Sequence, residues 1–134
     1  MKKKIVIFLF SSFFLLISCQ ITDTNSSYDP SLYTNENEPT TFLFSDENHI
    51  QEESSYYDAL LEFNRIHPEY NHSINIIPAY EQQLTNYYNI NVFPTLIVIY
   101  DLDVMVRIEG LKETKEILKV LERNLLHLHE EVSS

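Results

Sequence analysis

The chain has 134 residues, with 20 acidic and nine basic side chains, a formal net charge of −11, and only one glycine and one cysteine. A chain with this negative charge is not expected to bind nucleic acid, because contacts to phosphate need Lys and Arg. The single glycine excludes Gly-rich phosphate-binding loops, and the length allows one domain with extensions.

Residues 1–18 have the pattern of a secretory signal. Lysines at positions 2–4 precede an apolar run from Ile5 to Ile17. The run has about 13 residues, which is shorter than the roughly 20 that a membrane-spanning helix needs. We therefore expect a cleaved signal, and an uncleaved anchor is the alternative that the pattern leaves open.

The end of this signal is Leu16, Ile17, Ser18 and Cys19. These residues resemble the bacterial lipobox, and the resemblance implies that the thiol of Cys19 is lipidated and that the chain is cut just before it. The residues also fit an ordinary signal followed by a chance cysteine. Because Cys19 is the only cysteine and lies at the required place, we predict a lipid anchor on the outer face of a bacterial cell membrane.

A chain whose only cysteine carries lipid has no free thiol. It cannot exchange thiols for disulfides, because that chemistry needs a thiolate and a second, resolving cysteine. We therefore expect a protein that is not a redox enzyme.

Residues 19–39 are polar and rich in Asn, Ser, Thr and acidic side chains. They offer little apolar surface to bury, which predicts a flexible, acidic tether. A coil of about 20 residues would hold the domain roughly 25 Å from the membrane. Without residues 1–18 the formal charge becomes −14, and five of the six remaining Lys and Arg lie between Arg107 and Arg123.

A folded domain is expected over residues 40–128. Apolar runs bounded by turn residues predict strands at 40–45, 73–77, 95–100 and 104–108, with a turn at 101–103. Helical spacing of apolar residues predicts helices at 54–66, 80–88 and from 113 or 114 to about 128, with fraying at 129–134. Ser54 or Ser55 is the expected cap of the first of these helices.

The second half of this pattern resembles a known fold. Tyr88-x-Ile90-x-x-x-Pro94-Thr95, two strands joined by an acidic turn, Gly110 and a terminal helix resemble the C-terminal half of the thioredoxin family. The resemblance implies an α/β fold with a central mixed sheet of about four strands flanked by helices. It also implies a cis peptide bond before Pro94, whereas the residues alone favour a trans proline that opens an edge strand.

The resemblance fails at the motif that carries the family's chemistry. Its Cys-x-x-Cys would fall on or near residues 50–53, which are Ile, Gln, Glu and Glu. A redox-inactive member of the fold is therefore expected.

The family's peptide-binding groove lies beside the proline loop, where an extended peptide can pair with the backbone. The resemblance implies a groove lined by Ile50, Val92, Phe93, Pro94 and Thr95. Tyr87 or Tyr88 could add to its rim. The alternative is that Phe93 and Ile50 pack on each other and fill the space left by the missing cysteines.

No catalytic, cofactor or metal site is predicted. His127, His129 and the two glutamates after them could bind zinc or copper, but residues two apart do not share a helix face, so a solvated helix end is expected. His49 near Ser54 and Ser55 lacks the glycine turn of a nucleophile elbow.

Together these features predict a membrane-anchored extracytoplasmic lipoprotein that binds an envelope protein or peptide or has a structural role. Two alternatives stay open: a small lipoprotein that associates with the cell wall, and a non-catalytic accessory subunit of an envelope enzyme.

Overall fold

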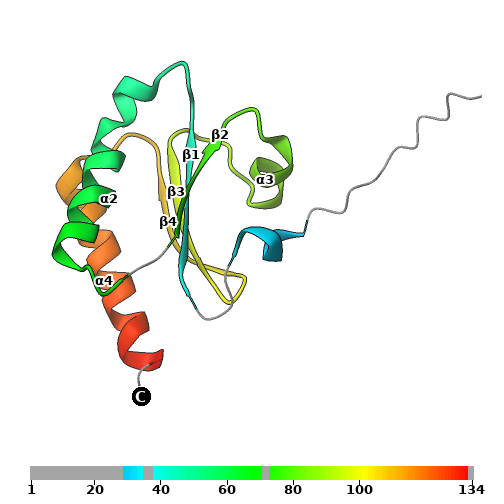
Figure 1. Ribbon diagram of the computed structural model, residues 1–134. Helices are drawn as coiled ribbons and strands as arrows, with labels where there is room; N and C mark the ends of the chain where they lie inside the picture. The colour runs from blue at the N-terminus through cyan, green and yellow to red at the C-terminus, as the bar shows by residue number, and fades with distance from the viewer. Residues whose placement is uncertain (1–28, 35–37, 71–72, 133–134) are drawn as a thin grey trace, which may run out of the picture.

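The computed structural model describes residues 29–34, 38–70 and 73–132 (Figure 1). The signal and lipobox at residues 1–18, Cys19 and the first part of the tether lie outside them. The described elements follow in the order η2 (Pro30–Tyr33), β1 (Thr40–Ser45), η3 (Ile50–Glu53), α2 (Ser54–Ile66), β2 (Ser73–Pro78), α3 (Gln82–Tyr87), β3 (Thr95–Tyr100), β4 (Asp103–Glu109) and α4 (Thr114–Val132), where η denotes a 3₁₀ helix.

The strands form one mixed sheet in the order β2-β1-β3-β4. β1 and β2 run parallel and are joined through α2, whereas β3 is antiparallel to both β1 and β4. All six residues of β1 are buried, as expected for a central strand covered on both faces. The predicted four-stranded α/β sheet is thus confirmed.

Helices cover the two faces of the sheet unequally (Figure 1). α2 and α4 lie side by side on one face, where Leu43, Leu96 and Val98 pack against Phe63, Leu121 and their neighbours. The short α3 lies on the other face, over a second cluster that includes Phe42, Phe44, Ile97, Ile99 and Tyr88. Because side chains alternate along a strand, neighbouring residues of β1 and β3 supply the two clusters in turn.

The β3–β4 hairpin is tighter than the sequence predicts. Asp101 and Leu102 both have positive φ, 50° and 69°, as a two-residue type I′ turn requires. Tyr100 therefore pairs directly with Asp103, so β4 begins one residue earlier than expected. A register shift follows, because Val98 pairs with Val106 but Ile99 pairs with Val104, and this leaves Met105 without a partner in β3.

Other boundaries also differ from the sequence-based expectation. β2 ends at Pro78, one residue late, and α3 is shorter than the helix expected at 80–88. Within the stretch expected to be a tether, residues 30–33 form η2, and the ring of Tyr33 meets Phe42 edge-on with centroids 6.4 Å apart. At the other end, α4 continues to Val132. Among the helices that the structure describes, none combines the length and the apolar composition needed to cross a membrane.

Candidate functional site

The proline loop and η3 meet at one end of the sheet. Phe44 near the end of β1 pairs with Thr95 at the start of β3. The segment that follows β1 and the loop that precedes β3 therefore leave the sheet at the same end. Topology thus brings residues 50–53 toward Pro94, although about 40 residues separate them in sequence.

The proline loop contains a cis peptide bond and is held by two hydrogen bonds. The Phe93–Pro94 bond is cis, as the thioredoxin resemblance implied. The hydroxyl of Thr95 donates to the carbonyl of Val92 at 2.7 Å, and the backbone N–H of Gly110 donates to the carbonyl of Pro94 at 2.8 Å. Pro94 and Thr95 are both buried.

Gly110 is suited to this contact by its backbone. Its φ is +74°, a conformation that costs little only for glycine. A Cβ there would lie 3.8 Å from a methyl carbon of Val92, which is ordinary contact, so the backbone angle and not space explains the glycine.

Glu53 occupies the place expected for the second cysteine of the family motif. Its side chain is 1% exposed. One carboxylate oxygen accepts the hydroxyl of Ser45 at 2.5 Å, and the other accepts the backbone N–H of Asp46 at 2.7 Å. A buried carboxylate with two donors thus links η3 to the end of β1, where the family would have a thiol.

This role of Glu53 was not predicted, although the sequence contains a signal for it. Glu53, Tyr56, Leu60 and Phe63 are spaced three, four and three residues apart, so the glutamate extends the buried stripe of α2. The predicted cap is also wrong, because α2 follows η3 directly, its N-cap residue is Glu53, and no side chain caps it.

Tyr56 is a second residue whose role was missed. It is fully buried, and its hydroxyl donates to the carbonyl of Gly110 at 2.5 Å. Burial, and to a smaller extent nearby carboxylates such as Glu116, raises its pKa to about 12. The neutral phenol therefore links α2 by a hydrogen bond to Gly110, whose N–H holds the proline loop.

An acidic rim lies beside η3. Nδ1 of His49 is 2.7 Å from a carboxylate oxygen of Asp46. That hydrogen bond raises the pKa of His49, and together with the N–H of Asn48 it lowers the pKa of Asp46. Glu47 and Glu52 are exposed nearby in sequence, so the rim favours a cationic ligand.

Some of the predicted groove residues are exposed, and the others are wholly or partly buried. Ile50 and Val92 are 50% and 44% exposed and can be reached by a ligand. Phe93 packs against the second core cluster, which accounts for its half-buried state without Ile50. Tyr87 is exposed, whereas Tyr88 is buried.

Across residues 29–34, 38–70 and 73–132, no three His, Cys, Asp or Glu side chains come close enough together to hold a metal ion. His127 is exposed near the end of α4, and the side chain of His129 lies outside the description.

Comparisons with solved structures agree on the fold. The chain is similar to thioredoxin O2 of Arabidopsis thaliana (17% identity, TM-score 0.54, 64% of this chain and 74% of that one). It is also similar to a thioredoxin-like protein from Clostridium perfringens (16% identity, TM-score 0.54, 68% of this chain and 74% of that one). A third similar structure is the thioredoxin-like domain of Arabidopsis NCP (15% identity, TM-score 0.56, 72% of this chain and 69% of that one). Identities this low show the fold alone, which is thioredoxin-like.

No model of a known protein family matches the chain. The Pal-related lipoprotein of Bacillus subtilis (strain 168) is 34% identical over 113 residues, which are 84% of this chain and 88% of that protein. An identity of this size over most of both chains is evidence of common descent, so the chain belongs to the family of the Pal-related lipoprotein of Bacillus subtilis.

Proposed function

We propose that this protein is anchored by lipid on Cys19 to the outer face of the cell membrane, and that its proline loop binds an extended peptide without thiol chemistry. The lipoprotein relative and the thioredoxin-like fold support the envelope setting. The lack of any cysteine after Cys19 supports a role in binding and argues against thiol redox catalysis.

One observation carries the binding role. In the part of the chain that the structure describes, no group pairs with the backbone N–H or C=O of Phe93. An extended peptide can pair with such unpaired backbone groups as an added strand. Val92 and Ile50 offer exposed apolar surface to its side chains.

The charge of the rim indicates the kind of peptide. Asp46, Glu47 and Glu52 lie at or near the site, and the chain as a whole is strongly acidic. An acidic surface attracts cationic partners and repels anionic ones. The proposed partner is therefore an extended segment that carries basic side chains.

The test uses the full chain in detergent micelles and a six-residue peptide of alternating valine and lysine. Binding should shift the NMR signal of the Phe93 amide, and Val92→Asp should weaken binding, because a charge replaces the apolar contact. Leu61→Asp is the matched control, since Leu61 is 70% exposed on α2. Equal weakening by both variants, or no shift at Phe93, would count against the proposal.

A further inference from the structure

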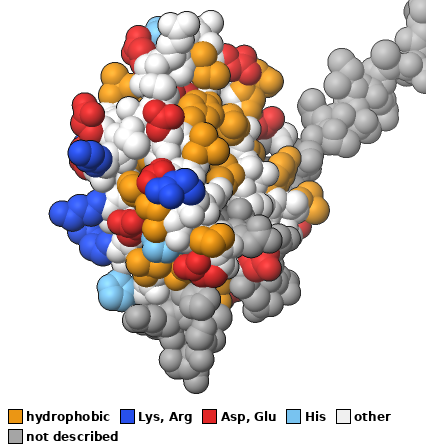
Figure 2. Space-filling model, turned by 60° about the vertical axis from the view of Figure 1, so that its left-hand side comes forward, with side chains coloured by type: hydrophobic (Ala, Val, Ile, Leu, Met, Phe, Trp, Pro, Cys, Tyr) orange, Lys and Arg blue, Asp and Glu red, His pale blue; other side chains and the backbone are white. Residues whose placement is uncertain are grey.

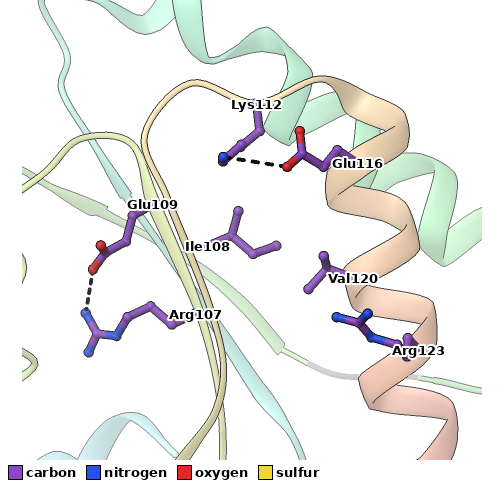
Figure 3. Close-up of a pocket in the computed structure, with 7 residues that line it drawn as sticks. All are labelled: Arg107, Ile108, Glu109, Lys112, Glu116, Val120 and Arg123. Carbon is purple, nitrogen blue, oxygen red and sulfur yellow. Dashed lines mark hydrogen bonds and ion pairs between the residues drawn. The ribbon is translucent and has the colours of Figure 1, made fainter.

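A pocket of about 410 Å³ lies between β4 and α4 (Figure 3). None of the predicted groove residues lines it, although Glu109 at its border pairs with Thr95. Ile108 of β4 and Val120 of α4 point toward each other across it and form its apolar floor. The pocket is largely open to solvent, so it is a surface groove that can seat a side chain of a bound segment.

β4 is an edge strand, and three of its residues line this pocket. The N–H of Gly110 donates to the carbonyl of Pro94, and hydrogen-bonded and non-hydrogen-bonded pairs alternate along an antiparallel ladder. Glu109, which pairs with Thr95, and Arg107, which pairs with Ile97, are therefore non-hydrogen-bonded pairs. Their N–H and C=O groups point away from β3, toward the free edge.

This part of the edge can accept another strand. The register shift at Met105 disturbs only the first half of β4, and the pairing of residues 106–109 is regular. Edge strands that must stay unpaired usually carry bulges, prolines or inward charges along their length. Residues 106–109 have no proline or bulge, and the charged side chains of Arg107 and Glu109 pair with each other, so the outward backbone groups remain available for pairing.

The pocket also holds a cation without a counter-charge. Arg107 is engaged by Glu109 at 3.3 Å and by the carbonyl of Tyr88 at 2.8 Å, and Lys112 is engaged by a carboxylate of α4 at 3.5 Å. Arg123 makes no ion pair or hydrogen bond in the described structure, and its guanidinium extends from α4 toward the gap (Figure 3).

The stretch around the pocket is less acidic than the rest of the chain. Residues 107–123 have five Lys and Arg and four glutamates, a formal charge of +1, whereas residues 20–64 have ten acidic side chains and no Lys or Arg. Figure 2 shows the Lys and Arg side chains gathered mainly along one side of the face in view, with acidic side chains among them. A carboxylate is thus repelled less at this side than by the rest of the molecule, and the guanidinium of Arg123 is the cation open to it.

From this arrangement we infer that the free edge of β4 and the pocket beside it bind an extended peptide segment that carries a carboxylate. The segment pairs with the outward groups of Arg107 and Glu109 as a fifth strand. Its carboxylate meets Arg123, and an apolar side chain lies on Ile108 and Val120. The inference is independent of the proposed role of the proline loop, since it concerns another surface and a ligand of opposite charge.

The charge contact is tested by fluorescence anisotropy on the full chain in detergent micelles. The probes are two labelled eight-residue peptides of alternating threonine and valine, one with a central glutamate and one with a central lysine. The glutamate peptide should bind more tightly. Arg123→Glu should weaken its binding about tenfold, the equivalent of about 1.4 kcal/mol, and should reverse the preference between the peptides.

Lys115→Glu is the matched control, because Lys115 is exposed on α4, has no ion-pair partner in the described structure and does not line the pocket. It makes the same change in charge and should leave the preference for glutamate intact. Equal effects of the two variants would show attraction by net charge only and would overturn the inference.

The strand pairing is tested at Glu109. Glu109→Pro removes an outward N–H that makes no bond to β3, and it should abolish binding, whereas Glu109→Gln keeps this N–H and should retain binding. Amide exchange supplies a test without substitution: the glutamate peptide should slow exchange at Arg107 and Glu109. Unchanged exchange at both, or binding by the proline variant that equals that of the glutamine variant, would refute strand pairing.

Discussion

Replacing the buried carboxylate of Glu53 should destabilise the domain more than any exposed acidic residue does. Glu53→Ala leaves the hydroxyl of Ser45 and the N–H of Asp46 without their acceptor. A buried donor left unpaired costs about 1–3 kcal/mol. Ser45 is buried and bears this cost, but Asp46 is partly exposed and water can replace its acceptor. We expect a loss of about 2–3 kcal/mol in the free energy of unfolding.

Two further variants decide whether hydrogen bonding is the cause. The amide of Glu53→Gln can accept the N–H of Asp46 and donate to the hydroxyl of Ser45, so it should cost only about 1 kcal/mol. Glu52→Ala, at the exposed neighbour, should stay within about 0.5 kcal/mol of the native chain. Urea unfolding followed by circular dichroism measures all three. If alanine and glutamine at position 53 cost the same, or if alanine costs less than about 0.5 kcal/mol, the two donors do not explain the burial of Glu53.

Other predictions concern the remaining contacts. Tyr56→Phe should lower the free energy of unfolding by about 1 kcal/mol, because the hydrogen bond to the carbonyl of Gly110 disappears. Since the pKa of Tyr56 is raised to about 12, its contribution to the free energy of unfolding should be complete below pH 10 and lost as the pH rises through 12. Urea unfolding of both forms between pH 8 and 12 should show the stability of the native chain falling toward that of the variant. NMR titration of His49 should give a pKa above 6.5 in the native chain, and Asp46→Asn should lower it by removing the charged acceptor; an unchanged value would contradict the contact. Cys19→Ala should move the protein from the membrane fraction to the soluble fraction on cell fractionation, and retention in the membrane would rule out the lipid anchor.

Much of the fold could be predicted because its signals are local. The apolar run of residues 95–100 matches β3 at both ends, since a strand buried on both faces needs only consecutive β-forming side chains. The helices α2 and α4 begin at or within a residue of the predicted positions, because the 3.6-residue period of a buried stripe is visible along the chain. The hairpin boundary differed because turn geometry depends on the backbone angles of Asp101 and Leu102, which their side chains do not specify.

The sequence by itself determined the lack of a second cysteine, the acidic charge and the order of strands and helices. Each of these is a property of single residues or of neighbours along the chain. Tertiary structure alone decided that Glu53 meets Ser45, that Tyr56 meets Gly110 and that β4 and Arg123 line one pocket. Hydrogen bonds and pockets of this kind join residues that are distant in sequence, and only the packing of helices on the sheet brings them within reach.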